Sequence, residues 1–323
     1  MRYLLFLFIL FTSCTNTVDK QTVLRGYVYG TTYNIIYFSE DDLQLKVKID
    51  SIFNTIDMSM STYNSNSLIS KINNNKEVVL DNHFKYVFNT SKKIYHETDG
   101  NFDPSIGPLV NSLNFGPKSN NVSSENLMNL VGLDKFKIIE NKLLRPENSF
   151  LDFNAIAKGY SVDVISEFLS FNNVTNFLIE VGGEIKSRGM NLDSNRSWRV
   201  GLDTPRFDGV LDEKDIYKAF NLQDKSMATS GVYRKFKIDS LGNKYAHIID
   251  PKTGYSSRTN ILSVTVISDN CIDADAYATA LHLMTLDEIK LFVQKNNKIS
   301  VFVIYEDKNN KMQDLSLNNF PSI

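Results

Sequence analysis

Hydrophobic and polar positions follow the period of a strand in some stretches of the chain and the period of a helix in others. Residues 24–38 alternate tyrosines and β-branched residues with polar ones, which predicts two strands meeting at Gly30. Residues 261–267 form a continuous β-branched run, typical of a buried strand. Apolar residues recur at helical spacing over 43–58 and again over 83–98, where an Asp-Gly pair follows as a stop signal. The chain therefore contains both kinds of element, and we find no repeats or heptads in it.

Weaker patterns predict further elements. A short helix capped by Asn64 or Ser65 should follow a loop that starts at Met58, and a longer helix should follow a strand end at residues 151–153. Strands are expected over residues 137–140, 143–145, 177–181, 198–202 and 219–222, and a hairpin over 235–238 and 244–249. We expect a rigid irregular loop at residues 103–108 and a turn over the small residues 227–231.

The stretch from 247 to 284 predicts a turn, a strand, a second turn and a helix. Residues 250–254 carry a proline and a glycine at turn spacing, and Asp273 is the expected helix N-cap. Asp275 and Thr279 then fall at positions i and i+4, on one face near the start of the helix. One carboxylate and one hydroxyl would therefore lie side by side where backbone N–H groups and the helix dipole favour anions.

Oxygen ligands of this kind suit a hard cation beside a phosphate. Mg²⁺ commonly takes one or two carboxylates from a protein and completes its octahedron with carbonyls, water and substrate phosphates, whereas Zn²⁺ favours nitrogen and sulfur ligands. The alternative is that Asp275 and Thr279 make a cap or a surface hydrogen bond, which the spacing by itself favours. The pair is therefore a candidate Mg²⁺ site only if other motifs support it.

Three other positions suggest a ligand. Lys158 falls in the first turn of its predicted helix, where a cation is disfavoured unless an anion lies nearby; an ordinary solvated lysine is the alternative. Gly182 and Gly183 end a predicted strand, and the missing side chains allow a ligand or another backbone to approach, although a simple bulge has the same signature. Tyr63 is either a core residue or a platform for a flat ring, and the sequence alone favours the core.

Composition and charge indicate an ordinary globular protein. The 323 residues are 42% hydrophobic and 22% charged, which is enough to bury a large core. The formal net charge is −2, and no cluster of lysine and arginine is interleaved with aromatic residues. We therefore exclude nucleic acid as an expected partner.

The N-terminus has the pattern of an export signal. Arg2 is followed by an apolar run that is too short to span a bilayer, and Thr12-Ser13 then places small residues before Cys14. This ending resembles a bacterial lipobox, whose cysteine becomes lipid-modified after cleavage; a short buried strand is the alternative. We expect residues 1–13 to be a signal peptide, residues 14–22 a lipidated tether, and the protein to be anchored in the bacterial cell envelope, facing the periplasm.

Seven short motifs occur in one order along the chain, and their succession resembles the ApbE family. They are M-S-T-Y at 60–63, G-N-F-D-P-S-I-G-P-L-V at 100–110, L-D-F-N-A-I-A-K-G-Y at 151–160, V-G-G-E at 181–184, A-T-S-G at 228–231, H-I-I-D-P-K-T-G at 247–254 and A-D-A-Y-A-T-A at 274–280. The resemblance extends from about residue 29 to residue 284. Members of this family are bacterial FAD:protein FMN transferases and are often lipoproteins.

The resemblance implies a fold and an activity. The fold would be α+β, a mixed-sheet fold with helices packed on the sheets and the active site in a cleft between two intimate subdomains, all within residues 23–323. Family members use Mg²⁺ to split FAD, release AMP and attach FMN through a phosphoester to a Thr or Ser of an exported flavoprotein. FAD, an acceptor flavoprotein and the membrane are therefore the expected partners.

The resemblance also implies roles for individual residues. His247 looks like the catalytic histidine of the family, a base that the residue type can supply near neutral pH. The Mg²⁺ ligands would be Asp275, Thr279 and the backbone carbonyl of Ala155. The contacts to FAD would come from Tyr29, Tyr63, Asn101, Phe102, Asp103, Asp152, Lys158, Ile249 and Ala278.

The chain departs from the family pattern at three places. Tyr29 stands where methionine is common, Asn114 where tryptophan is common, and Ser256-Ser257 where a proline is usual. The first two departures are expected to reshape the flavin pocket. Two other functions stay open at this stage: an Mg²⁺-dependent FAD pyrophosphatase that releases free FMN and AMP, and a non-catalytic FAD-binding lipoprotein.

Overall fold

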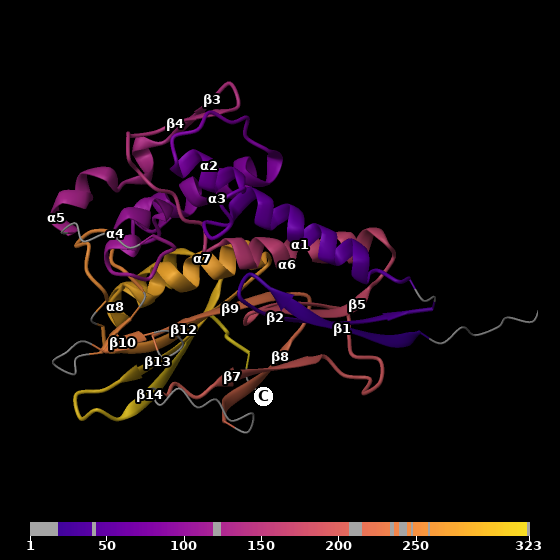
Figure 1. Ribbon diagram of the computed structural model, residues 1–323. Helices are drawn as coiled ribbons and strands as arrows, with labels where there is room; N and C mark the ends of the chain where they lie inside the picture. Colours follow the sequence, from indigo (N-terminus) through magenta and orange to yellow (C-terminus); the bar gives the residue numbers. More distant parts are fainter. Residues whose placement is uncertain are drawn as a thin grey trace, which may run out of the picture.

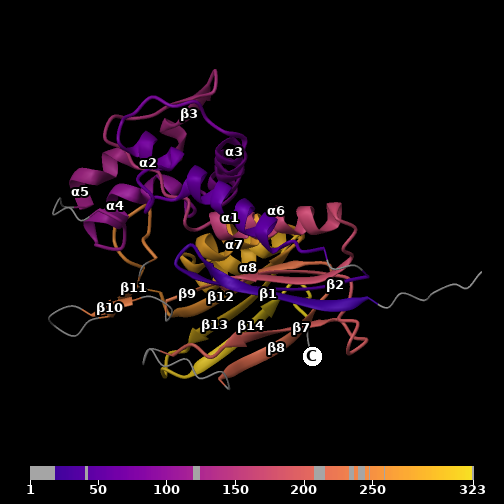
Figure 2. The same ribbon diagram turned by 45° about the vertical axis from the view of Figure 1, so that its right-hand side comes forward.

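An eight-stranded sheet forms the centre of the molecule, and helices cover one of its faces (Figures 1 and 2). The computed structural model describes residues 19–40, 43–118, 124–206, 215–232, 236–238, 244–246, 248–257 and 259–321. The strand order in the sheet is β1-β2-β5-β6-β9-β12-β13-β14. The bounds of these strands are β1 Lys20–Val28, β2 Thr31–Ser39, β5 Asn176–Val181, β6 Glu184–Arg188, β9 Ser226–Gly231, β12 Ile261–Ser268, β13 Ser300–Glu306 and β14 Met312–Leu317.

Three short hairpins accompany the sheet. They are β3 Lys137–Ile139 with β4 Lys142–Leu144, β7 Trp198–Asp203 with β8 Ile216–Leu222, and β10 Phe236–Ile238 with β11 Lys244–Ala246. Apolar side chains of the β7–β8 hairpin pack with residues of β9, β12 and β13, so this hairpin covers the sheet face opposite the helices (Figure 1).

The helices form a layer on the sheet and a lobe above that layer. In Figure 1, α1, α6 and α7 run above the sheet, and α2 to α5 with the β3–β4 hairpin stand farther from it. The helices are α1 Lys46–Met60, α2 Leu68–Asn73, α3 Asn82–Glu97, α4 Gly107–Ser112, α5 Ser124–Leu127, α6 Ala157–Phe171, α7 Cys271–His282 and α8 Leu286–Lys295, with short 3₁₀ helices η1 Pro104–Ile106, η2 Met128–Leu130 and η3 Leu133–Lys135.

The fold is α+β, as the resemblance implies, but the sheet is antiparallel where we expected a mixed one. Every pairing between described strands of the large sheet is antiparallel. The connection between β12 and β13 shows the reason. It consists of two helices, α7 and α8. Because α8 returns the chain to the end of the sheet where β12 finished, β13 starts at that end and runs in the opposite direction.

Helix α7 is buried on nearly all sides. It lies between the sheet and the upper helices, and it contacts β9, β12, α6 and α3. Strand β12 beneath it is buried at every position. The neighbouring strand β9, Ser226–Gly231, has mostly small side chains, which leave room for a helix at close range. We expected a turn over 227–231; that prediction is wrong, because pairing with β12 and packing under α7 override the low strand propensity of these small residues.

One apolar core joins the lobe to the sheet. The largest cluster of buried residues includes Phe84 and Phe88 of α3, Leu281 of α7, and Val264 and Val303 of the sheet. The two expected subdomains therefore share a core and do not have separate ones.

Several predicted boundaries differ from the structure near the site. Helix α1 continues to Met60, beyond the predicted end at 58. Helix α2 is capped by Ser67 and not by Asn64 or Ser65; the Ser67 side chain accepts a hydrogen bond from the N–H of Ser70 at 3.1 Å. Residues 104–112 are helical, not irregular, because each of the two prolines stands at the first or second position of a helix, where its missing N–H costs nothing.

Two other boundaries need correction. Helix α7 begins at Cys271 with Asn270 at its N-cap position, so Asp273 lies in the first turn and is not the cap. Strand β1 begins at Lys20 and pairs with β2 from there, so the last residues of the expected tether 14–22 belong to the sheet. Their side chains are mostly polar and exposed, as suits an edge strand, and this composition resembles a linker.

Within the part of the chain that the structure describes, no helix has both the length and the apolar character that a membrane crossing requires. The expected signal peptide and Cys14 lie outside the described residues.

Candidate active site

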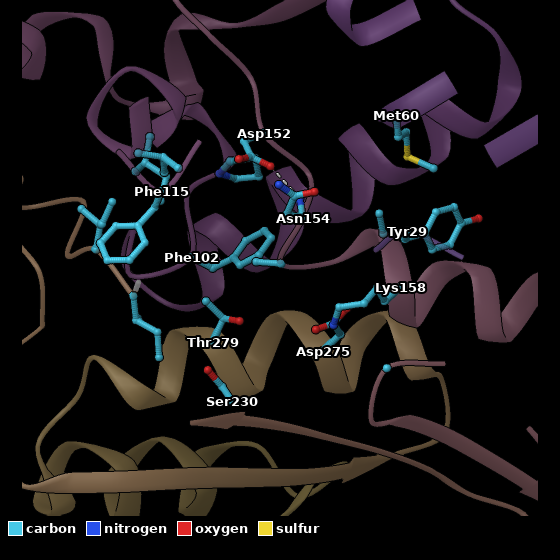
Figure 3. A pocket seen from close by; sticks show the side chains of 18 of the residues that line it. Tyr29, Met60, Phe102, Phe115, Asp152, Asn154, Lys158, Ser230, Asp275 and Thr279 are labelled. Carbon is cyan, nitrogen blue, oxygen red and sulfur yellow. Dashed lines mark hydrogen bonds between the residues drawn. The ribbon is translucent and has the colours of Figure 1, made fainter. Parts of the chain in front are cut away.

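A cavity of about 810 Å³ lies between helices α6 and α7 on one side and the helical lobe on the other. Figure 3 shows Asp275 and Thr279 of α7 pointing into it from below, with Phe102, Phe115 and Asp152 on the opposite side. The expected site residues among those that line it are Tyr29, Tyr63, Asn101, Phe102, Asp103, Asp152, Ala155, Lys158, Ile249, Asp275 and Thr279.

Helix α7 supplies Asp275 and Thr279 from one face, as their spacing predicts. Asp275 is buried, with 5% of its surface exposed, and its Oδ2 accepts a hydrogen bond from the backbone N–H of Gly159 at 3.0 Å. Gly159 lies in the first turn of α6, so the two helices meet at this carboxylate. The hydrogen bond fixes one carboxylate oxygen and orients the group at the edge of the cavity.

The close approach of α6 to α7 requires glycine at position 159. A Cβ atom built on Gly159 would lie 2.3 Å from the carbonyl oxygen of Cys271 and 2.8 Å from the Cβ of Asp275. Both contacts are shorter than real Cβ atoms tolerate, and neither partner is the end of a flexible side chain. The glycine therefore sets how near the helix of Asp275 can come to the start of α6.

Ala155, whose backbone carbonyl is the third expected ligand, also lines the cavity, two residues before the start of α6. Gly159 lies in the first turn of α6, where N–H groups have no acceptor within the helix, and its N–H donates to Asp275. Among the described residues, the Ala155 carbonyl accepts no backbone hydrogen bond. A carboxylate, a hydroxyl and a carbonyl oxygen fit a hard cation such as Mg²⁺, which completes its shell with water or ligand oxygens.

The described residues contain no group of three or more His, Cys, Asp or Glu side chains placed to hold a metal ion. The candidate site at Asp275 is of a different kind, because it has a single carboxylate.

Lys158 forms an ion pair with Glu184 in the same part of the cavity. The distance from Lys158 Nζ to a Glu184 carboxylate oxygen is 2.6 Å, and the Glu184 side chain is only 3% exposed. The Lys158 side chain passes over Gly182, where an added Cβ would lie 3.4 Å from Lys158 Cδ and 2.7 Å from a methyl group of Thr31. The Gly182-Gly183 pair forms the turn between β5 and β6, and at Gly182 the neighbours are side chains, of Thr31 and Lys158, and not the ligand or backbone that the sequence suggested.

The lobe supplies the aromatic side of the cavity. Tyr63 is 60% exposed, and its hydroxyl donates to the carbonyl oxygen of Phe115 at 3.4 Å. Our preference for Tyr63 as a core residue is therefore wrong, because α2 and the preceding turn hold its loop at the rim of the cavity. Phe102 is buried and packs in the core beneath the cavity wall, and Asn101 is half-buried beside it.

Asp103 is a buried acid on this side of the cavity. It is 5% exposed, and its Oδ1 accepts hydrogen bonds from the N–H of Ser105 at 2.8 Å and from its hydroxyl at 2.6 Å. Removal from water raises the pKa of the Asp103 carboxyl to about 6, although these hydrogen bonds act in the opposite direction. Asp152 lies at the same wall, and its Oδ1 accepts the N–H of Asn154 at 2.8 Å.

The raised pKa of Asp103 predicts a pH-dependent stability. The contribution of the protonated Asp103 carboxyl to the free energy of unfolding is fully present below the unfolded-state pKa near 3.8, and it is lost as the pH rises through about 6. Because Asn does not ionise and keeps an acceptor oxygen, Asp103→Asn should gain stability relative to the wild type by on the order of 2–3 kcal/mol between pH 4 and pH 7. Urea unfolding of both proteins at several pH values measures this difference. A difference that stays constant with pH would contradict the assignment.

Tyr29 lies in the turn between β1 and β2. Val28 pairs with Thr31, so Tyr29 and Gly30 form a two-residue turn, and both have positive φ angles, of 53° and 75°. The Tyr29 hydroxyl donates to the carbonyl oxygen of Phe53 at 3.1 Å, and its ring meets the Phe53 ring edge-on. Burial raises the pKa of this hydroxyl far above its usual value. Tyr29 therefore lines one end of the cavity and packs against α1.

Other expected site residues have different outcomes. Ile249 is buried and lines the cavity, next to the turn at 250–254, where the side chain of Asp250 accepts hydrogen bonds from the N–H of Lys252 and the hydroxyl of Thr253. Ala278 is 1% exposed and is not among the cavity-lining residues, because its side chain faces the core. His247 lies outside the described residues.

The sequence reasoning missed several residues that line the cavity. Glu184 stands in the V-G-G-E motif without an expected role, although an acidic residue directly after a glycine pair at a strand end is a signal for a site. Met60 ends α1 and opens the M-S-T-Y motif without an expected role, and Phe115 follows α4 outside the seven motifs. Thr229 and Ser230 line the cavity from β9; the small residues of this segment suggest packing under a ligand, but the pattern predicts a turn and not a strand.

The fold and the cavity define an α+β protein with a large two-sided cavity. One part of the cavity has the carboxylate of Asp275 and the ion-paired Lys158, and the lobe wall has aromatic side chains. The chain belongs to the ApbE family, whose model matches residues 29–303.

Proteins of similar sequence and structure match this chain over most of its length. An FAD:protein FMN transferase of Vibrio cholerae is 32% identical, with 88% of this chain and 87% of the relative covered, and one of Haemophilus influenzae is 29% identical, with 90% and 88% covered. A structure of the flavin transferase ApbE from Vibrio cholerae matches with a TM-score of 0.82 at 29% identity, covering 94% of this chain and 98% of that one. The apo flavinyl transferase ApbE of Pseudomonas stutzeri also matches with a TM-score of 0.82, at 26% identity, covering 93% and 95%.

Proposed function

We propose that this protein is an Mg²⁺-dependent FAD:protein FMN transferase. The observation that carries the proposal is the cavity itself, in which Asp275, Thr279 and Lys158 lie around one part and Tyr63 exposes an aromatic face at the lobe. A volume of about 810 Å³ is in the upper range of small-molecule sites and suits a ligand as large as a dinucleotide. The names of the similar proteins support the same function.

The polar part of the cavity suits the pyrophosphate of FAD. Asp275, Thr279 and the Ala155 carbonyl would hold Mg²⁺. When bound, the ion would neutralise charge on the phosphate oxygens and so favour attack on the phosphorus and departure of AMP. Lys158, near the N-terminus of α6, offers a second positive charge to the same anion, and its ion pair with Glu184 keeps its ammonium group at the cavity wall.

The aromatic part suits the isoalloxazine. The exposed face of Tyr63 can stack on a flat ring, and the buried rings of Phe102 and Phe115 make the adjoining wall apolar. Asp152 and Asn101 are polar neighbours that can hydrogen-bond to the ligand. We therefore propose that the reacting phosphorus binds near the α6–α7 contact.

The proposed reaction moves the FMN half of FAD to a hydroxyl group. The hydroxyl oxygen of a Thr or Ser on the acceptor protein forms a bond to the FMN phosphorus, while the bond from that phosphorus to the bridging oxygen breaks. AMP leaves with the bridging oxygen, and the proton of the hydroxyl passes to a base, for which we propose His247. The product is FMN joined to the acceptor by a phosphoester.

We also propose that the protein is anchored in the bacterial cell envelope through a lipid on Cys14, faces the periplasm and acts on exported flavoproteins. The apolar run before Cys14 and the small residues next to it support this location. Growth with a labelled fatty acid tests it: label should enter the wild type and be absent from Cys14→Ala, and equal labelling of both would refute the anchor.

The function is tested by incubating the purified protein with FAD, Mg²⁺ and a flavoprotein fragment that carries an acceptor threonine. We expect a fluorescent acceptor band whose mass has grown by one FMN less water, together with AMP, and both should be lost in EDTA. Free FMN and AMP with an unmodified acceptor would instead favour a pyrophosphatase. FAD that stays intact would favour a binding protein.

Replacing His247 with alanine should abolish transfer and leave FAD binding within about twofold, because a base acts on the acceptor and not on the flavin. Flavin fluorescence measures binding, and in-gel fluorescence measures transfer. His83 provides a control substitution. It lies outside the cavity, where its Nδ1 is hydrogen-bonded to the Tyr160 hydroxyl at 2.7 Å, so its replacement should retain transfer. A His247→Ala protein that transfers FMN normally would exclude His247 as the base.

A further inference from the structure

Helices α6 and α7 are joined by two carboxylates, one from each helix. Asp275 of α7 accepts the N–H of Gly159 in α6, as described above. One turn farther along α6, Asp163 accepts the N–H of Cys271 at 3.0 Å on Oδ1 and the N–H of Ile272 at 2.9 Å on Oδ2. Each helix therefore supplies a carboxylate to the backbone of the other.

Asp163 acts as the N-terminal cap of a helix to which it does not belong. At the N-cap position of α7 itself, Asn270 makes no side-chain capping bond among the described residues. The first N–H groups of a helix need acceptors, and a carboxylate also interacts favourably with the positive end of the helix dipole. Both oxygens of Asp163 are used in this way, so its carboxylate fixes α7 in position and in rotation.

The strand layer holds Asp163 in turn. The ammonium group of Lys186, on β6, lies 2.7 Å from Asp163 Oδ1 and also donates to the carbonyl oxygen of Asp269 at 3.2 Å. The Asp163 side chain is 13% exposed and that of Lys186 is 18% exposed, so the pair is shielded from most solvent. One carboxylate therefore ties α6, β6 and the start of α7 together.

The spacing of these contacts relates Asp163 to the proposed site. Asp163 is four residues after Gly159, and Asp275 is four residues after Cys271, so the cap and the Gly159 contact lie one helical turn apart on both helices. A rotation or slide of α7 that released the cap would also displace Asp275 and Thr279 from Gly159, Lys158 and Ala155. Asp163 does not line the cavity itself.

We infer that Asp163 is a positioning residue for the phosphate and cation end of the site, which it aligns through α7 without touching the ligand. This inference rests on the proposed function, because it assigns Asp163 the task of holding Asp275 and Thr279 where they can bind Mg²⁺. It predicts that loss of the carboxylate weakens the response to Mg²⁺ more than it weakens flavin binding.

The test compares Asp163→Ala, Asp163→Asn and the wild type in the full chain. The Mg²⁺ concentration for half-maximal FMN transfer should rise about 10- to 100-fold in Asp163→Ala, as for other residues that support a metal ligand. The increase in melting temperature on addition of MgCl₂ with FAD should shrink in parallel, which gives a readout that does not depend on turnover. FAD affinity in EDTA, followed by flavin fluorescence, should change by less than about twofold. Asp163→Asn keeps one acceptor oxygen and should recover part of the Mg²⁺ response.

Asp81→Ala is the matched control. Asp81 caps α3 by accepting the N–H of Phe84 at 2.7 Å, so its loss also removes a helix cap, but on another helix. It should leave the Mg²⁺ requirement unchanged. An equal shift in Asp81→Ala, or a wild-type Mg²⁺ requirement in Asp163→Ala, would overturn the inference. If Asp163→Ala does not fold, Asp163→Asn decides in the same way. A wild-type protein without Mg²⁺-dependent transfer would overturn the proposed function as well.

Discussion

Replacing Asp275 with alanine should reduce Mg²⁺-dependent FMN transfer by on the order of 10³-fold or more, the rate equivalent of several kcal/mol. Asp275 supplies the carboxylate of the proposed cation site, and Thr279 and the Ala155 carbonyl, which are uncharged, cannot replace its charge. The substitution also leaves the N–H of Gly159 without its acceptor, which should lower the free energy of unfolding by about 1 kcal/mol. Transfer rates measured over a range of Mg²⁺ concentrations, with urea unfolding beside them, separate the two effects.

Asp273 offers a control on the same helix. It lies one half-turn earlier, is half-buried outside the cavity, and its carboxylate is 3.9 Å from the ammonium group of Lys93. Asp273→Asn should therefore keep the Mg²⁺ dependence of the wild type. The cation site assigned to Asp275 would be wrong if Asp275→Ala transferred FMN with normal rate and normal Mg²⁺ dependence.

Replacing Gly159 with alanine should both destabilise the protein and impair the site. The added methyl group would meet the Cys271 carbonyl oxygen at 2.3 Å and the Cβ of Asp275 at 2.8 Å, so α6 and α7 must separate. Overpacking of this kind commonly costs about 1–3 kcal/mol. Separation also lengthens the hydrogen bond that orients Asp275, so the Mg²⁺ response should weaken. Chemical denaturation measures the first effect, and transfer at limiting Mg²⁺ measures the second.

Gly201→Ala provides the comparison. This glycine lies in β7, and an added methyl group would first meet a side-chain carbon of Ile216 at 3.2 Å, which can move by a few tenths of an ångström. We expect a change in stability below about 1 kcal/mol there. If Gly159→Ala were equally mild, the close packing of α6 on α7 would not be needed for the site.

The sequence predicted the local elements that strong periodicity or turn chemistry defines. The β1–β2 hairpin at Gly30, helix α3 and strand β12 are all present, and the i, i+4 spacing of Asp275 and Thr279 does place both at one cavity. These are short-range features, for which apolar spacing and stop signals are sufficient. The order of the motifs pointed to the ApbE family, which the family match confirms.

Features that depend on distant partners were not predicted. Strand β9 has small residues with weak strand propensity, and it is a strand because β6 and β12 pair with it and α7 covers it. The cap of α7 comes from Asp163, which is 108 residues from Cys271 in the chain, so local sequence could only suggest Asp273. For Tyr63 the residue pattern by itself favours the core, because hydrophobicity does not reveal which aromatic ring faces a cavity, and only the family resemblance implies a contact to the flavin.

The two walls of the cavity differ in how freely they can vary. Helix α7 is enclosed by β9, β12, α3 and α6, so a change of volume on that wall disturbs the whole interior. The lobe wall ends in the exposed ring of Tyr63 and in loops around α4, where new side chains can project into the cavity with little repacking. Engineering for synthetic flavin analogues should therefore start at the lobe, where recognition of the ring can be altered while the chemistry at the phosphate is left intact.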